Sequence, residues 1–143
     1  MKLSTKTRYA ARAMLELALN DSNDPLQIKV IAERQQISEK YLEQLIVVLK
    51  SAGYVRSVRG PKGGYFLAKA PEEIKLSDIF YAFEGSITTS ECVEDSSRCS
   101  RSSNCVMREV WTKVESAVVN VLESITLKDL AEKSNFTRLN YHI

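Results

Sequence analysis

The 143-residue chain is long enough to bury one sizeable core, as a single compact unit or as a small domain with an appended helix. Its composition, 44% hydrophobic and 27% charged, excludes an intrinsically disordered chain. The net charge of +2 is unevenly spread, because residues 1–70 carry 12 Lys and Arg against 6 Asp and Glu, whereas residues 71–143 carry 8 against 12. The first half is therefore a candidate nucleic-acid-binding surface.

The basic half begins with two predicted helices. Apolar residues recur at helical spacing over residues 4–20, with Ser4 or Thr5 near the start, and the polar run Asp21–Pro25 ends this helix. A short helix is predicted from Ile28 to about residue 36.

A third helix is predicted from Glu39 to about Ala52, with Ser38 as its cap and Gly53 as its stop. Its expected buried stripe is Leu42, Leu45, Ile46 and Leu49. Its expected outward residues are Glu39, Lys40, Glu43, Gln44 and Lys50. Two helices joined by a tight turn, the second polar on its outer face, indicate a helix-turn-helix.

A β-hairpin is predicted directly after this helix pair. Residues Tyr54–Arg59 and Tyr65–Ala68 are strand-like, and the turn-rich segment Gly60–Gly64 joins them. Because this glycine-rich segment joins two strands and opens no helix, it matches neither a P-loop nor a dinucleotide fingerprint. A helix-turn-helix followed by a basic hairpin predicts a winged helix, with Arg59 long and cationic enough to enter a narrow minor groove.

The acidic half is predicted to be helical. Ser77 is placed to cap a helix over residues 78–84, which Gly85 ends. A longer helix follows Cys105, and its apolar stripe is broad: Val106, Met107, Val110, Trp111, Val114, Ala117, Val118, Val121, Leu122 and Ile125. Such a stripe is too broad for a lone appended helix, so we expect it to pack against a second copy of the chain.

The expected organisation is mainly α-helical with a small β-hairpin, in three parts. Residues 1–70 form a winged helix-turn-helix DNA-binding domain, residues 71–133 a cysteine loop with a dimerisation helix, and residues 134–143 a loose tail. A short helix begins near Thr126. The sole histidine, His142, falls in the tail, so we expect it to be solvated and a weak candidate ligand.

All three cysteines lie in one polar, glycine-free stretch, as Cys92, Cys99 and Cys105. Structural cysteines are usually dispersed through a core, and this stretch has no apolar run to bury them. We recognise no signal peptide or apolar span of membrane length, so we expect a cytoplasmic protein, where thiols stay reduced and clustered cysteines serve metal or redox chemistry.

Three kinds of site compete for these cysteines. A single zinc site prefers Cys pairs two to four residues apart, and the gaps here are longer. A thiol redox sensor needs a cysteine of low pKa beside a resolving partner. The positive charge of Arg98, Arg101 or Arg108 could lower the pKa of such a thiol. An iron–sulfur cluster takes four ligands, largely thiolates, and suits three widely spaced cysteines. A cysteine-dependent enzyme would need a base beside its thiolate, and the position of the histidine argues against one.

The chain resembles the Rrf2 family of transcriptional regulators over nearly its whole length, to about Leu130. The resemblance rests on the opening segment Met1–Ala10, the Ile37–Leu45 helix, the Val58–Tyr65 wing and the three cysteines. Within the family it is most similar to the iron–sulfur regulators of the IscR type. This resemblance implies a homodimeric, DNA-binding regulator of iron–sulfur cluster biogenesis genes, with a [2Fe–2S] cluster as cofactor, operator DNA and cluster-assembly proteins as partners, and no membrane association.

The fourth ligand of such a cluster departs from the family pattern. The iron–sulfur regulators have a histidine three residues after the last cysteine, where this chain has Arg108, and nitric-oxide-sensing relatives use an N-terminal carboxylate, where it has Arg8. Glu109 lies one turn after Cys105 and is a weak candidate. Other candidates are Glu91, Glu94, Asp95, a group of the partner chain or an exogenous ligand.

The expected mechanism has two states, in which a bound cluster orders the loop and an empty loop has little to hold it down. Ser38, Lys40, Tyr41 and Gln44 are expected to contact phosphates or base edges, and Glu43 either accepts from a cytosine or is a solvated surface charge. The full set of candidate DNA-binding residues is Ser4, Lys6, Tyr9, Ser38, Glu39, Lys40, Tyr41, Glu43, Gln44, Arg59, Gly60, Lys62, Gly63, Gly64 and Tyr65. Two alternatives use the same loop and helix: sensing of nitric oxide or thiol redox state, and sensing of a partner protein.

Overall fold

The computed structural model describes the backbone of residues 3–141 and the side chains of residues 3–138. Its first part contains three helices and a hairpin, namely α1 (Thr5–Leu19), α2 (Ile28–Gln35), α3 (Glu39–Ser51), β1 (Val55–Val58) and β2 (Gly64–Leu67). α2 and α3 are joined by a tight turn in which Gln36 adopts a left-handed conformation, with φ of 55°. The predicted winged helix-turn-helix is therefore confirmed.

Local side-chain chemistry sets the starts of α1 and α3. The Oγ of Ser4 accepts a hydrogen bond from the Thr7 amide at 3.2 Å, and the Oγ of Ser38 accepts one from the Tyr41 amide at 3.2 Å. Each hydroxyl satisfies an amide that the first helical turn leaves without a backbone partner. Both caps agree with the sequence prediction.

The hairpin is anchored to the helix-turn-helix by the segment that precedes α2. β1 and β2 pair antiparallel, with Val55 opposite Leu67. Leu26 then pairs with Tyr65, through amide-to-carbonyl hydrogen bonds of 3.0 and 2.9 Å. A Cβ at Gly64 would lie 2.5 Å from the Leu26 carbonyl oxygen, so this close approach requires glycine. The wing is therefore held beside the start of α2.

The main core lies between α1, α2, α3, the hairpin and two later helices, α4 (Leu76–Glu84) and α7 (Leu127–Tyr141). Its fully buried members include Ala10, Ala13, Met14, Ile31, Leu42, Leu49, Ile74, Ile79 and Leu127. A 3-10 turn, Pro71–Glu73, leads into α4. The chain re-enters this unit beside the start of α4, where the Leu76 amide donates to the Ile125 carbonyl at 2.8 Å and the Leu127 amide donates to the Ile74 carbonyl at 2.9 Å. We call residues 3–85 and 126–141 the body.

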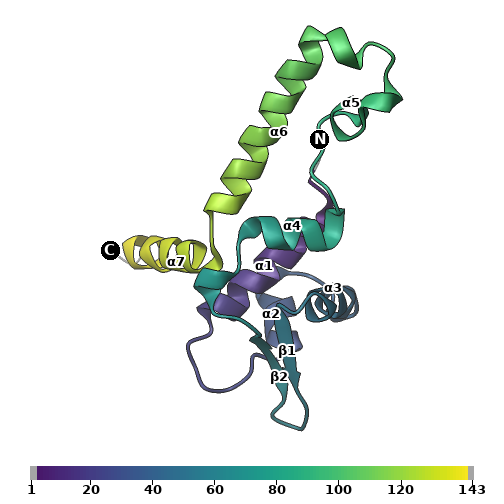
Figure 1. Ribbon diagram of the computed structural model, residues 1–143. Coiled ribbons are helices and arrows are strands. Elements are labelled where there is room, and N and C mark those ends of the chain that lie inside the picture. Colours follow the sequence, from purple (N-terminus) through teal and green to yellow (C-terminus); the bar gives the residue numbers. More distant parts are fainter. Residues whose placement is uncertain (1–2, 142–143) are drawn as a thin grey trace.

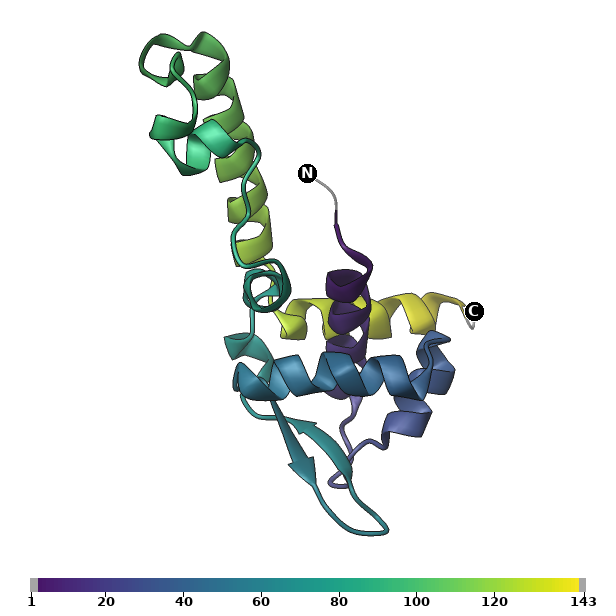
Figure 2. The ribbon, with the colours of Figure 1, turned by 90° about the vertical axis from the view of Figure 1, so that its right-hand side faces the viewer.

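The intervening residues, 86–125, form the arm, which projects from the body (Figures 1 and 2). A short segment runs outward along the arm, and a long helix runs back to the body. The long helix is α6 (Val106–Ser124), and the segment before it contains α5 (Glu91–Glu94) and two 3-10 turns, Ser96–Arg98 and Ser102–Asn104. At its base the arm packs on α4 through a small second cluster of Phe80, Ile87 and Leu122.

Two sequence predictions about helix ends are wrong. Ser77 does not cap α4 but is buried within its first turn, and the helix begins two residues earlier, at Leu76, because the Asp78 carboxylate accepts from the Lys75 amide at 2.8 Å. The predicted loose tail is helical through Tyr141, since residues 134–141 contain no Gly or Pro to end α7. His142 lies outside the described residues. Within the described part of the chain, no helix is long and apolar enough to cross a membrane.

Candidate DNA-binding face and cysteine segment

The outer face of α3 is mostly polar and exposed to solvent. Glu39, Lys40, Glu43 and Gln44 are all exposed, as the sequence predicts. Val47 continues the same stripe, three residues after Gln44, and its side chain is 62% exposed. Val47 is not among the residues that were predicted to face outward, although it lies three and four residues after the outward positions Gln44 and Glu43. An exposed aliphatic side chain on this face is suited to contact with a thymine methyl group.

Tyr9 and Tyr41 link α1 to α3 at the edge of the core. Both are partly buried, and their rings meet edge to face with centroids 6.0 Å apart. The Arg12 guanidinium lies 5.4 Å from the centre of the Tyr9 ring. These two candidate DNA-binding residues therefore also hold the recognition helix in place. Ser38 uses an oxygen lone pair for its cap and keeps its O–H free to donate.

A buried carboxylate fixes α2 against α1. Glu16 is 4% exposed, and its two oxygens accept from Arg34 at 3.2 Å and from the Gln35 amide group at 2.6 Å. Arg12 in turn donates to the side-chain and backbone oxygens of Gln35, at 2.6 and 2.9 Å. Because buried charges destabilise unless paired, this network favours one arrangement of the helix-turn-helix. Hydropathy alone gave no signal for it.

The tip of the wing is exposed and basic. Arg59, Gly60 and Lys62 are exposed, whereas Gly63, Gly64 and Tyr65 are half-buried, the last two beside Leu26. Gly60 has a positive φ of 120°, which favours glycine, and its carbonyl accepts from the Gly63 amide at 2.9 Å. The structure thus brings the predicted wing residues together beside α2 and α3.

Ser4 and Lys6 lie apart from this group. Ser4 caps α1 and Lys6 is in its first turn, which lies at the opposite end of the body from the wing (Figures 1 and 2). Thr7 donates to the Glu84 carboxylate at 2.5 Å, and hydrogen bonds from Ser4 and then Thr7 lower the pKa of Glu84. In the single chain these residues tie α1 to the end of α4.

The three cysteines lie at the far end of the arm. Cys92 is in α5, Cys99 follows the first 3-10 turn, and Cys105 is the cap residue of α6. All three are free thiols and half-buried. Among the residues that the structure describes, no three Cys, His, Asp or Glu side chains gather closely enough to hold a metal ion.

Residues 86–105, which we call the cysteine segment, are tied to α6 by hydrogen bonds that do not involve sulfur. Arg108 donates from Nε to the Cys92 carbonyl at 2.9 Å. Thr89 donates from its amide to Glu115 at 3.1 Å and from its hydroxyl to the Trp111 carbonyl at 3.0 Å. These bonds hold the segment against α6, and the two-state mechanism stays a prediction.

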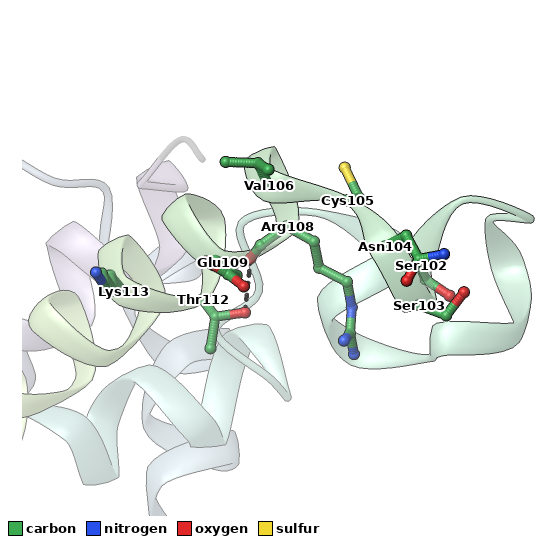
Figure 3. A pocket seen from close by; sticks show the side chains of 9 residues that line it. All are labelled: Ser102, Ser103, Asn104, Cys105, Val106, Arg108, Glu109, Thr112 and Lys113. Carbon is green, nitrogen blue, oxygen red and sulfur yellow. Dashed lines mark hydrogen bonds between the residues drawn. The ribbon is translucent and has the colours of Figure 1, made fainter.

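The candidate fourth ligands differ in their surroundings. Cys105, Arg108 and Glu109 line one open cleft of about 610 Å³ (Figure 3), in which the Cys105 sulfur points away from the Arg108 guanidinium. Asp95 accepts from the Ser97 hydroxyl and amide, at 2.7 and 3.0 Å, and these bonds lower its pKa.

Glu91 and Glu94 both lie in α5, beside Cys92, and both are exposed. Glu94 accepts from Ser86 at 3.4 Å. Glu109, in contrast, lines the same cleft as Cys105.

One face of α6 is apolar and exposed. Its members, with their exposed fractions, are Val106 (72%), Met107 (49%), Val110 (41%), Trp111 (40%), Val114 (42%) and Val121 (56%). A contiguous apolar surface of this kind on a projecting helix is typical of a protein interaction surface.

A helix-turn-helix with a polar, exposed recognition helix and a basic wing defines a winged-helix DNA-binding regulator. The family model for Rrf2, described as an iron-dependent transcriptional regulator, matches residues 3–133. The chain belongs to the Rrf2 family and is a transcriptional regulator, not an enzyme.

The chain is similar to several differently named regulators of this family. The chain is 41% identical over 140 residues to the Rrf2 protein of Nitratidesulfovibrio vulgaris, covering 98% of this chain and 93% of that protein. It is similar to the structure of CymR, the global cysteine regulator of Bacillus subtilis, with a TM-score of 0.81, 41% identity, and coverage of 93% and 98%. It is also similar to the structure of IscR of T. potens, with a TM-score of 0.76, 43% identity, and coverage of 94% and 88%. The predicted resemblance to IscR is thus matched by an equal resemblance to CymR.

Proposed function

We propose that this regulator binds operator DNA as a homodimer and that a [2Fe–2S] cluster on Cys92, Cys99 and Cys105 changes its affinity for that DNA. The observation that carries this proposal is the position of the three free thiols in one segment, tied by Arg108 to the start of α6. A change in that segment acts directly on the helix that leads back to the DNA-reading body. We further propose that its targets are genes of iron–sulfur cluster biogenesis.

The dimer would form through the apolar face of α6. Trp111 and Val114 are about two-fifths exposed and lie near the middle of that face. Burying such side chains against the same face of a second copy is favourable by about 25 cal/mol per Å² of apolar surface. Because the cysteine segment contacts Trp111 through Thr89, it lies next to the expected interface.

The donor chemistry of the segment fits a thiolate-bound cluster in part. Three free cysteines supply three ligands, and Glu109 is the candidate fourth, because it shares a cleft with Cys105. When bound, the cluster would supply a redox-active and ligand-exchanging centre. The role of this chain's own residues is to bring the three thiols together, which requires the segment to close further than in the described structure. Arg108 cannot ligate iron and instead holds the Cys92 backbone.

The cluster assignment is tested by the visible spectrum, iron content and sulfide content of anaerobically purified protein. Wild type should show an iron–sulfur chromophore, and Cys92→Ala, Cys99→Ala and Cys105→Ala should each lose it while staying folded. Glu109→Ala should shift the spectrum or speed loss of the cluster in air. If all three cysteine variants kept wild-type iron and sulfide, the assignment would be wrong.

Direct thiol redox sensing is the second candidate, and it is favoured by a different observation. Cys92 lies 2.9 Å from the Ser90 hydroxyl, in a partly buried position beside Arg108. The similar CymR of Bacillus subtilis is described as a global cysteine regulator. This candidate predicts colourless anaerobic protein whose DNA affinity changes on oxidation and is restored by a thiol reductant.

The DNA-binding face is tested by a pair of variants. Lys62→Ala should weaken binding to every sequence alike and reduce the salt slope by about one phosphate equivalent. Gln44→Ala should cost roughly 1–3 kcal/mol at one base position. Unchanged operator affinity in both variants would place the DNA-binding surface elsewhere.

A further inference from the structure

A basic groove lies between the wing, the start of α2 and the end of α3. It has a volume of about 520 Å³ and is open to solvent along one side. The backbone pairing of Leu26 with Tyr65 sets this arrangement, because it fixes the start of α2 against the second strand of the wing. Three elements that are distant in sequence thereby contribute to one surface.

The groove carries positive charge without compensating acid. Its charged residues are Lys29 from α2, Lys50 from α3 and Arg59 from the wing, and no Asp or Glu lines it. All three cations are exposed, and none forms an ion pair within the described part of the chain. Unpaired like charges held near one another repel, so the groove favours an anionic partner.

The shape of the groove favours a long anion over a small one. Its cations come from three separate elements and are not enclosed around a single point. Gly60, Gly63 and Gly64 are among its lining residues, and because they have no side chain a ligand backbone can approach the protein backbone closely there. A DNA strand presents successive phosphates at regular spacing, which suits such a spread of cations.

We propose that this groove binds the sugar–phosphate backbone of operator DNA, with Lys29 and Lys50 as phosphate contacts in addition to Arg59. The inference rests on the proposed DNA-binding function and deepens it. Lys29 lies on α2 and Lys50 near the end of α3, and Gln44 does not line the groove. The contacts therefore set affinity and register and carry no base preference.

The experiment measures binding of the full chain to two duplexes by fluorescence anisotropy over a range of salt concentrations. One duplex is selected by the wild-type protein from a random library, and the other is its scrambled sequence. Lys29→Ala and Lys50→Ala should each weaken binding to both duplexes by the same factor, roughly fivefold, and each should lower the salt slope by about 0.9. The double variant should lower the slope by about 1.8.

Two control variants keep this test specific. Lys128→Ala removes an exposed lysine from α7 and should leave the slope unchanged. Lys29→Arg retains the positive charge and should keep the wild-type slope. Thermal unfolding of each variant verifies that its body is intact.

Wild-type slopes in both alanine variants, alongside a reduced slope in Lys62→Ala, would overturn the groove assignment and leave the proposed function standing. A loss confined to the selected duplex would also overturn it, because the lysines would then read bases. Failure of wild type to bind either duplex would instead refute the proposed DNA-binding function.

Discussion

The body and the arm are stabilised by different interactions. In the body, side chains such as Met14, Leu42 and Leu49 are completely buried, and helix caps and a paired carboxylate satisfy the polar groups around them. In the arm, the cysteine segment is tied to α6 mainly by hydrogen bonds, and apolar side chains of α6 face solvent. The core of the body is buried within the single chain, whereas the arm exposes an apolar helix face and carries three free thiols.

This difference separates the two tasks of a regulator. We propose that the DNA-reading surfaces are on the body and that a signal on the arm reaches them through α6. The hydrogen bonds that hold the cysteine segment are few, so a bound group could shift it. Substitutions in the two regions should therefore produce distinct defects.

The largest effect is expected in the body. Leu42 is fully buried in α3, and Leu42→Ala should destabilise the protein by about 2–5 kcal/mol, because it removes buried methyl groups and leaves a cavity. Val106→Ala, on a side chain that is 72% exposed, should change stability by less than about 0.5 kcal/mol. Urea unfolding of both variants, at a concentration where the chain is monomeric, measures this contrast. Equal destabilisation would remove the distinction between body and arm.

The next effect concerns association through α6. Trp111→Ala should weaken dimerisation by about 2 kcal/mol, roughly thirtyfold, as expected for a large aromatic residue at the centre of an interface. Sedimentation equilibrium gives the dimer dissociation constant, and Phe136→Ala is a matched control, because Phe136 is an exposed aromatic residue on α7. If Trp111→Ala dimerised like wild type and Phe136→Ala did not, the interface would lie on the body.

A smaller, local effect is expected from Arg108. Arg108→Ala removes a charge-assisted hydrogen bond to the Cys92 carbonyl, worth about 1.5–3 kcal/mol, so amides of residues 89–95 should exchange with deuterium faster. Amides of the body should exchange as in wild type. Arg108→His tests the same position differently, since imidazole can ligate iron and should slow loss of a cluster in air if the ring reaches the metal. Unchanged exchange in Arg108→Ala would mean that the segment is held by other contacts.

The smallest effect is a pH dependence at the junction of α1 and α4. Hydrogen bonds from Ser4 and Thr7 lower the pKa of Glu84 below its ordinary value of 4.5. The stabilisation is therefore fully present above pH 4.5 and is lost as the pH falls through the lower pKa of the folded state. Glu84→Gln should flatten the acid side of the stability profile. A wild-type acid profile in this variant would show that the carboxylate does not contribute.

Features that depend on residues close together in sequence can be predicted from it. The predictions of the caps at Ser4 and Ser38 and of the hairpin turn are correct for this reason. Ser77 fails as a cap because Asp78, three residues after Lys75, competes for the same helix start. The winged helix and the polar face of α3 follow from periodicity. The dimer through α6 stays a prediction, since its partner surface belongs to another chain.

The cysteine segment shows where sequence reasoning ends. Its spacing identifies three thiols in one stretch, but the segment has no periodicity from which their relative positions could be predicted. Arg108 is recognisable in sequence as an absent ligand, whereas its bond to Cys92 spans 16 residues and required the structure. Likewise, Lys29 and Lys50 share a groove with Arg59 because Leu26 pairs with the wing, a contact that no local pattern indicates.

The link between the cysteine segment and the DNA-binding body can be measured directly. Affinity for the selected duplex should be determined anaerobically for wild type and for the Cys92→Ala, Cys99→Ala, Cys105→Ala triple variant, before and after reconstitution with iron and sulfide. We expect wild type to gain a visible chromophore and to change its affinity at least about tenfold, equivalent to ~1.4 kcal/mol of coupling, while the triple variant gains neither. A wild-type protein that gains the chromophore without any change in affinity would contradict the assignment of this segment as the sensor.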